Sequence, residues 1–175
     1  AYEIRNCDWS SDVCSSDLQR TKMELTFELC TLEWAIEYQD MVREHIAVDG
    51  DYPFNNYPLA LADFSAYVAE LQDEAAGIGL PPHIPAQDTL LLVADGARVI
   101  GELRFRPRLV ENISPENQNG HIGYNLRPSL RGQGIGTRLI ALAKALGQEC
   151  GLERLYLTIS PENLASQRKI GRAHV

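Results

Sequence analysis

The chain has 175 residues, of which 45% are hydrophobic and 23% charged, and its formal net charge is -8 at pH 7. This composition suits a single folded domain with an ordinary core, and the acidic balance disfavours nucleic-acid binding, which normally needs a basic face. The longest apolar run, 89–94, is far shorter than a membrane span. We therefore expect no nucleic-acid or membrane partner and, by default, a cytoplasmic location.

The two ends of the chain differ from its middle. Residues 8–18 read DWSSDVCSSDL, which one frame of a common short-read sequencing adapter encodes, and residues 170–175 fit the opposite strand of the same adapter. We therefore expect residues 1–18 and 170–175 to lie outside the fold, natural tails being the alternative. The domain that remains spans 19–169 and stops, on this interpretation, inside a helix.

The first half of the domain predicts one strand and two helices. Residues 23–30 alternate apolar and polar side chains, which is typical of a half-buried strand. Apolar residues at helical spacing predict helices over 32–46 and 59–71. The segment between these helices, 49–58, contains glycine, proline and asparagine and is predicted to be a loop, as is the proline-rich segment 77–85.

A hairpin is predicted next. Asp95-Gly96 separates two apolar segments, 90–94 and 99–106, and an Asp-Gly pair in that position is a strong hairpin signal. Alternation within the second strand puts Glu102 on the face opposite the apolar side chains. A carboxylate on such a face is usually solvated.

The most informative segment is Arg131-Gly132-Gln133-Gly134-Ile135-Gly136. A predicted strand over 121–126 precedes it, and an amphipathic helix follows, then a core strand over 155–159 and a helix that begins at Asn163. Alternating glycines let the backbone approach a ligand closely, and the N-terminus of a helix presents unpaired N–H groups and a positive dipole end. The segment therefore predicts a site for phosphate oxygens.

Two common phosphate-binding loops do not fit this segment. A Walker loop needs a lysine after its last glycine, but Thr137 follows Gly136. A dinucleotide fingerprint that begins at Gly132 needs a glycine where Thr137 stands, and it normally belongs to an early strand–helix unit. An unrelated nucleotide-binding module is therefore disfavoured.

The segment instead resembles Arg/Gln-x-x-Gly-x-Gly/Ala, the pyrophosphate loop of the GNAT acetyltransferase superfamily. Gly-His-Ile-Gly-Tyr at 120–124, Arg-Pro-Ser at 127–129 and Glu-Asn-Leu-Ala-Ser at 162–166 extend the resemblance to a bacterial subfamily usually described as predicted acetyltransferases. The resemblance is strong over 118–169 and weaker back to about Met23.

The resemblance implies an α/β protein with the GNAT (acyl-CoA N-acyltransferase) fold, a mixed central sheet flanked by helices. The predicted order of strand, two helices, three strands, helix, strand and helix is the GNAT order up to its fourth helix. The last two strands of the family are missing, and they normally flank the strand predicted over 155–159. We therefore expect an unpaired edge there, which would favour aggregation.

The resemblance also implies acetyl-CoA as the acetyl donor, without a metal. The pantetheine arm would lie beside Leu126, where a backbone N–H polarises the thioester carbonyl, and beside Asn163, with Ser166 one helical turn on. For Asn163 a plain helix N-terminal position is the alternative. Arg131 would add charge to the pyrophosphate loop or fix it. The remaining loop residues that would hold the pyrophosphate, mainly through backbone N–H groups, are Gly132, Gln133, Gly134, Ile135, Gly136 and Thr137.

Direct acetyl transfer needs an unprotonated amine, so a base is expected. His121 occupies the strand position where related acetyltransferases often carry a glutamate base, and imidazole titrates near neutrality; a structural histidine is the alternative. Glu102 is the second candidate. Tyr124 has the chemistry of an acid, but alternation places it opposite His121, which favours core packing. The tyrosine acid of many GNAT enzymes would fall at Ile170, in the adapter-like segment.

We predict an N-acetyltransferase that transfers an acetyl group from acetyl-CoA to a primary amine. Truncation of the chain would be expected to reduce or abolish this activity. The acceptor, a small molecule or a peptide, would be shaped by the first two helices and the loop 51–57, whose aromatic residues line a pocket or cover the core. A homodimer is one option. The alternative function is a non-catalytic acyl-CoA-binding regulatory domain on the same fold, which would share the glycine loop and differ at the base.

Overall fold

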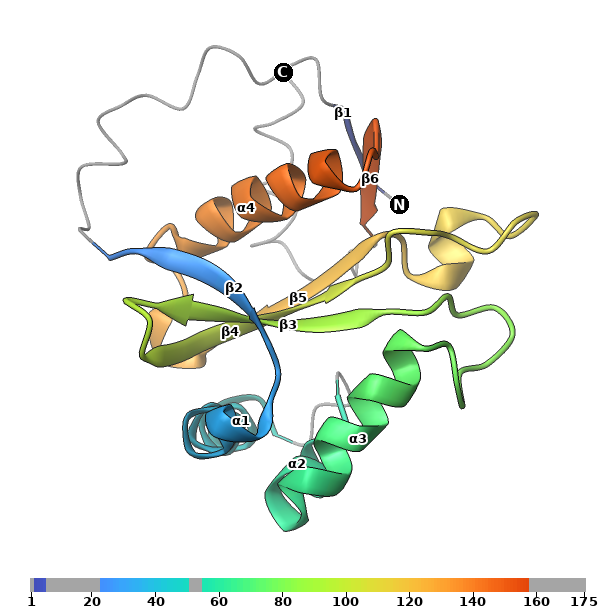
Figure 1. The fold of residues 1–175 in the computed structure, drawn as a ribbon. Helices are drawn as coiled ribbons and strands as arrows, with labels where there is room; N and C mark the ends of the chain where they lie inside the picture. The colour runs from blue at the N-terminus through green and yellow to red at the C-terminus, as the bar shows by residue number, and fades with distance from the viewer. Residues whose placement is uncertain (1, 6–22, 51–54, 158–175) are drawn as a thin grey trace.

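The computed structural model describes residues 2–5, 23–50 and 55–157, and its centre is a mixed six-stranded sheet (Figure 1). The strands follow the order β1-β6-β5-β4-β3-β2. Neighbouring strands are antiparallel except β5 and β6, which are parallel. The bounds are β1 (Tyr2–Arg5), β2 (Leu25–Leu29), β3 (Asp88–Ala94), β4 (Arg98–Phe105), β5 (Ile122–Leu126) and β6 (Arg154–Leu157).

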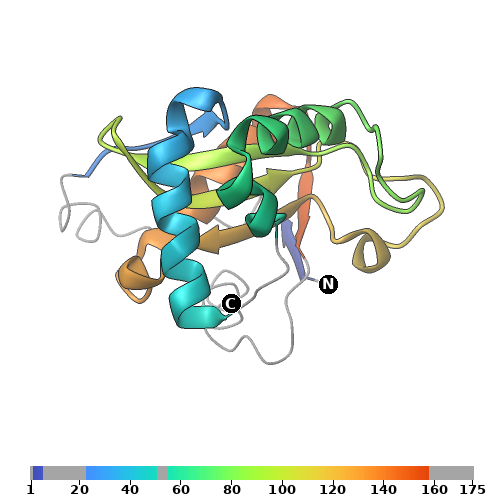
Figure 2. The ribbon, with the colours of Figure 1, turned by 90° about the horizontal axis from the view of Figure 1, so that it is seen from below.

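Helices cover both faces of the sheet (Figures 1 and 2). On one face lie α1 (Ala35–Asp49), α2 (Tyr57–Ala62) and α3 (Phe64–Ala75), and on the other lies α4 (Ile135–Glu149). Short 3-10 turns occupy Leu32–Trp34, Pro115–Gln118 and Pro128–Leu130. No helix in the described part of the chain has the length and apolar character needed to cross a membrane.

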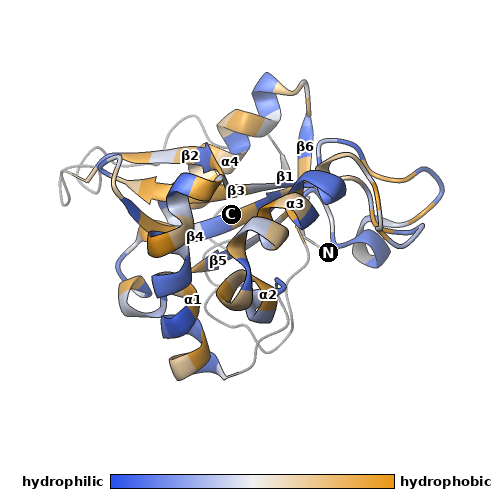
Figure 3. Ribbon diagram, turned by 60° about the horizontal axis from the view of Figure 1, so that its bottom comes forward, coloured by the Kyte–Doolittle hydropathy of each residue, from blue (hydrophilic) through white to orange (hydrophobic). Residues whose placement is uncertain are grey.

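The helices and the sheet enclose two cores, one on each face. The core under α4 contains Leu103, Leu126 and Leu139, and the core under α1–α3 contains Tyr38, Tyr57 and Leu91. Both α1 and α4 carry hydrophilic as well as hydrophobic residues (Figure 3), as helices do when one side packs on a sheet and the other meets solvent. The predicted GNAT architecture, a mixed sheet flanked by helices, is confirmed.

The hairpin is also confirmed, but the second predicted helix is not continuous. Asp95 and Gly96 have φ values of 50° and 66°, the two positive angles that a type I′ turn requires. The helix predicted over 59–71 is instead two helices that break at Asp63, where φ is -148° and ψ is 93°. The Asp63 carboxylate accepts a hydrogen bond from the Ala66 N–H at 3.0 Å. Capping the first turn of α3 in this way competes with continuing α2.

The prediction of an unpaired edge beside β6 is wrong. β1 pairs antiparallel with β6, with Tyr2 opposite Leu157 and Arg5 opposite Arg154. An open edge presents a row of unpaired N–H and C=O groups, and any extended segment within reach can satisfy them. Residues 2–5 therefore belong to the sheet, contrary to our expectation for the N-terminal segment. The domain limits 19–169 stay a prediction, because 6–22 and 158–175 lie outside the described residues.

Candidate functional site

The glycine loop leads directly into α4, as predicted. Gly134 is the N-cap residue of α4 and has left-handed angles, φ 82° and ψ -8°, while Gly132 has φ 78°. A Cβ atom built at either glycine would meet no neighbouring atom within 4 Å in the described structure. Glycine is needed here for the backbone conformation, and among the described residues the space beside both glycines is open.

Backbone N–H groups gather at this point. The first helical hydrogen bonds of α4 run from Thr137 N–H and Arg138 N–H to the Gly134 carbonyl, at 3.1 and 3.4 Å. The N–H of Thr137 is therefore already engaged, whereas the N–H groups of 133–136 precede the first helical bond. The Gln133 side chain donates to the Ser129 carbonyl at 3.0 Å and closes the loop. Such an N-terminus attracts anions through its dipole.

Arg131 ties the loop to two other elements. Its Nε donates to the Leu126 carbonyl at 3.1 Å, and its Nη1 and Nη2 donate to the Asp49 carboxylate at 2.7 and 2.6 Å. These hydrogen bonds from Arg131 hold the pKa of Asp49 at about 2, although partial burial opposes the shift. Of the two roles predicted for Arg131, the geometry favours fixing the loop.

The end of β5 offers a backbone N–H on the side away from β4. Arg127 N–H donates to the Ile100 carbonyl at 2.9 Å, so the preceding Leu126 N–H points away from that strand. It donates to the Oδ1 of Asn125 at 3.0 Å. Among the described residues, the register joins β5 to β6 only between Ile122 and Leu157. The 123–126 segment of β5 thus has a strand partner on its β4 side alone in the described part of the chain.

Glu102 is fully buried, so the expectation of a solvated carboxylate is wrong. Side chains from α1, from α2 and from Asn55, which precedes α2, reach it on this face of the sheet. Tyr57 Oη donates to Oε1 at 2.6 Å, and Tyr38 Oη and Asn55 Nδ2 donate to Oε2 at 2.7 and 2.5 Å. Burial, and next the nearby Glu102 charge, raise the pKa of Tyr38 and of Tyr57. Both phenols therefore stay protonated and act as donors.

The carboxylate belongs to a buried polar network that reaches towards the glycine loop. Asn125 Nδ2 donates to Tyr57 Oη at 3.1 Å and lies 3.4 Å from His45 Nδ1. His45 is fully buried, and its Nδ1 lies 3.1 Å from Asp49 Oδ2 and 3.3 Å from Arg131 Nη2. Sequence reasoning did not find this network. The signal was a carboxylate on a strand face that tyrosine-bearing helices cover, because a buried carboxylate requires donors.

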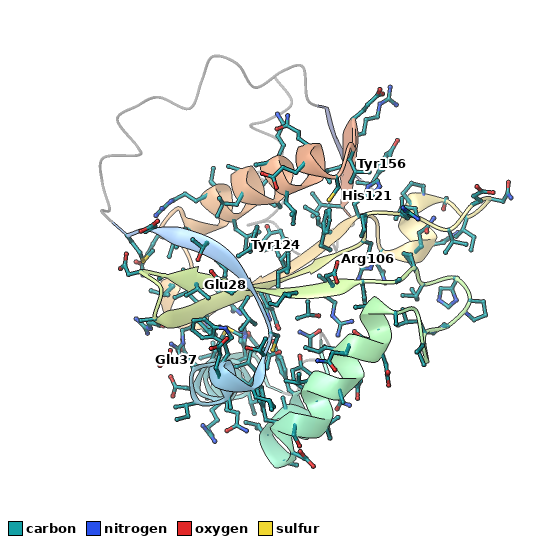
Figure 4. All side chains as sticks on the ribbon, viewed as in Figure 1. Glu28, Glu37, Arg106, His121, Tyr124 and Tyr156 are labelled. Carbon is teal, nitrogen blue, oxygen red and sulfur yellow. The ribbon has the colours of Figure 1, made fainter. Side chains whose placement is uncertain are left out.

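His121 lies at the other end of β5 and is nearly buried. Its Nδ1 accepts a hydrogen bond from the Tyr156 N–H at 3.0 Å, and its ring stacks on Tyr156 at 5.5 Å between centroids (Figure 4). Burial, then the charge of Arg106, lower the pKa of His121. A neutral ring whose Nδ1 accepts a hydrogen bond carries its proton on Nε2 and has no free lone pair. This geometry favours the structural alternative.

The structure does not bring the two candidate bases together. Glu102 lies opposite Asn125 in the β4–β5 register, four positions along β5 from His121, or roughly 13 Å at the usual rise of a strand. Tyr124 packs against the core under α4, which confirms its packing role. Asn163 and Ser166 lie outside the described residues, as does most of the predicted acceptor loop.

The family model described as the Acetyltransferase (GNAT) family matches residues 34–170. The chain therefore belongs to the GNAT acetyltransferase family, which carries acyltransferase activity. No curated protein matches it significantly by sequence.

Three solved structures are similar to this chain. The first is a GNAT-family acetyltransferase from Streptococcus pneumoniae, 16% identical, with a TM-score of 0.53 over 85% of this chain and 82% of that one. The second is the Microcin C7 self-immunity acetyltransferase MccE with acetyl-CoA and AMP, 18% identical, with a TM-score of 0.53 over 86% and 77%. The third is the aminoglycoside N-acetyltransferase AAC(6')-Iy with CoA, 19% identical, with a TM-score of 0.51 over 88% and 89%. These likenesses establish the fold.

Proposed function

We propose that the protein is an N-acetyltransferase that transfers an acetyl group from acetyl-CoA to a primary amine. The observation that carries the proposal is the glycine loop at the start of α4, where Gly132 and Gly134 have positive φ and no described residue fills the space beside them. The N–H groups of Gln133, Gly134, Ile135 and Gly136 would bind the pyrophosphate, and the helix dipole would add to the attraction. Two of the similar structures contain acetyl-CoA or CoA, which supports this donor.

The donor's pantetheine arm would run along 123–126 of β5, on the side that faces away from β4. Leu126 N–H would polarise the thioester carbonyl there and stabilise the oxyanion that forms when the amine attacks. For this to happen the Asn125 side chain, which accepts from that N–H, has to swing aside. Asn163 and Ser166 would contact the arm from the segment after β6.

Glu102 is the base that we favour, acting through Tyr57. Tyr57 Oη donates to Glu102 and accepts from Asn125, which is half-buried and stands beside Leu126. Tyr57 could therefore take a proton from the incoming ammonium group on its oxygen while it passes its own proton to Oε1 of Glu102. His121 is the second candidate, but the proton on its Nε2 would have to leave before that nitrogen could accept another.

The acceptor would be a small molecule or a peptide with a free amine. The formal net charge of -8 is compatible with a cationic acceptor, and AAC(6')-Iy, one of the similar structures, is an aminoglycoside acetyltransferase. A cytoplasmic location and a homodimer stay predictions. A non-catalytic acyl-CoA-binding domain is the alternative, and it would use the same glycine loop.

Titration with acetyl-CoA tests the loop, and release of free CoA in the presence of a panel of primary amines tests catalysis. Gly134→Val should raise the Kd for acetyl-CoA about tenfold or more, worth about 1.4 kcal/mol, because valine disfavours the positive φ and fills the phosphate space. Gly79→Val is the matched control, since Gly79 also has a positive φ of 77° and open space around it. Equal Kd values for wild type and Gly134→Val would refute the loop's role, and tight binding without CoA release would favour the regulatory alternative.

A further inference from the structure

Two arginines at the end of β5 form ion pairs with α1. Arg127 pairs with Asp40 and, through Nε at 2.9 Å, with Oε2 of Glu44. Arg131 pairs with Asp49, the last residue of α1. Arg131 is the first residue of the glycine loop, whereas Arg127 lies outside it.

Protein groups already use most of the hydrogen-bond donors of the Arg131 guanidinium. A guanidinium has five N–H donors, and here three are committed: one to the Leu126 carbonyl and two to the Asp49 carboxylate. Nη2 also lies 3.3 Å from His45 Nδ1, so the inner side of the group is enclosed by protein. The paired charges of Asp49 and Arg131 cancel, which leaves little net attraction for a phosphate from this pair.

We propose that Asp49 is a positioning residue for the pyrophosphate loop. Through Arg131, Asp49 holds the backbone between Leu126 and Gly132 in place, and so keeps the N–H groups of 133–136 aimed at the phosphate site before the donor arrives. A loop that is already ordered pays less entropy on binding. Arg131 then acts as a tie between α1, β5 and the loop, and the backbone binds the phosphates. This inference rests on the proposed use of acetyl-CoA.

If Arg131 binds the phosphates directly, the Asp49→Asn change should alter the Kd for CoA in the opposite direction. If Arg131 were a phosphate ligand that Asp49 holds in reserve, then Asp49→Asn would free the guanidinium and remove a negative charge near the phosphates. Binding of CoA would then tighten. If Asp49 positions the loop, Asp49→Asn weakens binding, because the loop must be ordered when CoA binds. The direction of the change in Kd therefore decides between the two roles.

The experiment measures the Kd for CoA by calorimetry in the full chain and in four variants. Asp49→Asn should raise the Kd roughly fivefold. Asp40→Asn is the matched control, since Asp40 lies on the same helix and pairs with an arginine outside the loop, and its Kd should equal that of the wild type. The double variant Asp49→Asn/Arg131→Gln should bind no more weakly than Arg131→Gln alone, because both changes break the same tie.

A second readout separates positioning of the loop from general damage to the fold. S-acetylpantetheine lacks the pyrophosphate, so Asp49→Asn should lower kcat/KM for acetyl-CoA and leave kcat/KM for S-acetylpantetheine unchanged. A Kd for CoA that is unchanged or lower in Asp49→Asn would overturn the inference while the proposed function stands, and so would an equal loss with both donors. A wild-type chain that binds no CoA would overturn the proposed function and this inference together.

Discussion

Glu102 and His121 are both buried on the same sheet, but they differ in what their side chains leave available. His121 uses Nδ1 to hold the Tyr156 backbone and stacks on its ring, so it fastens β6 to β5. Glu102 uses both oxygens to accept from side chains of α1, of α2 and of Asn55, which precedes α2. One of those donors, Tyr57, contacts the half-buried Asn125, which gives Glu102 a route towards the surface beside Leu126.

Kinetics of Glu102 and His121 variants test the assignment of the base. Glu102→Gln should lower kcat roughly 10²–10⁴-fold, the usual contribution of a positioned general base, and Tyr57→Phe should do the same if Tyr57 relays the proton. The loss should shrink as pH rises, because the free amine then becomes abundant without a base. The Kd for acetyl-CoA should stay near the wild-type value in both variants.

His121→Ala serves as the comparison in the same pH–rate profile. We expect kcat to change little, because Nδ1 of His121 is occupied and Nε2 carries its proton. If His121→Ala instead shows the large, pH-sensitive loss and Glu102→Gln does not, His121 is the base. Thermal unfolding of each variant separates a loss of chemistry from a loss of fold.

Residue roles could be predicted from the sequence where the backbone alone decides them. The positive φ of Gly132 and Gly134 follows from local chain geometry, so the loop was found from its glycines. The donors around Glu102 come from positions 38, 55 and 57, about 45 to 64 residues away. No local pattern reports contacts at that separation. The ion pair between Asp49 and Arg131 could not be predicted for the same reason, because the two residues are 82 positions apart.

At the scale of elements, strands and helices with a clear period were predicted well, and boundaries set by side chains were not. The hairpin, β2 and α4 lie where alternation, turn residues and glycines placed them. The break at Asp63 depends on one carboxylate that caps α3, which apolar spacing does not register. The close contact of β4 and β5 at Gly101 could not be predicted from the sequence either, because Asn125 and Leu126 lie 24 and 25 residues further along the chain.

At Gly101, β4 lies close against β5. A Cβ atom there would lie 2.7 Å from the Asn125 carbonyl oxygen and 2.9 Å from Cδ2 of Leu126. Gly101→Ala should lower the free energy of unfolding by about 1–3 kcal/mol, a typical cost of overpacking, and it should weaken acetyl-CoA binding by displacing Leu126. Denaturant titration gives the first quantity and calorimetry the second.

Gly147→Ala is the control for this substitution. The three atoms nearest to its Cβ would all belong to the Leu155 side chain, at 3.0 to 3.4 Å. That side chain can shift, and alanine is the better helix former inside α4. We expect the stability of Gly147→Ala to lie close to that of the wild type. Equal stability of Gly101→Ala and wild type would show that β5 can move away from β4 without cost.

At the scale of the molecule, the family resemblance gave the correct fold class, with which the order of elements agrees, but the edge of the sheet was predicted wrongly. The sequence analysis predicted an open edge beside β6, because it expected the strands that flank this strand in the family to be missing. In the structure β1 occupies this edge with four backbone positions in register, Tyr2–Arg5 against Arg154–Leu157. Pairing of this kind depends on main-chain groups, so sequence patterns that report side-chain burial carry little information about it.

A variant that begins at Met23 tests whether β1 is needed for folding or only protects the edge. Both hydrophobic cores are built from residues within 23–152 and 155–157, so removal of residues 1–22 should leave a folded protein with a similar far-ultraviolet circular dichroism spectrum. The outer edge of β6 would then be exposed, and exposed edges pair with other chains. Light scattering should show more association for the shortened chain than for the full chain, and thermal unfolding should begin at a lower temperature.

A shortened chain that fails to fold would show that the β1–β6 pairing is part of the folding core. One that neither associates nor loses stability would show that another segment replaces β1 at this edge.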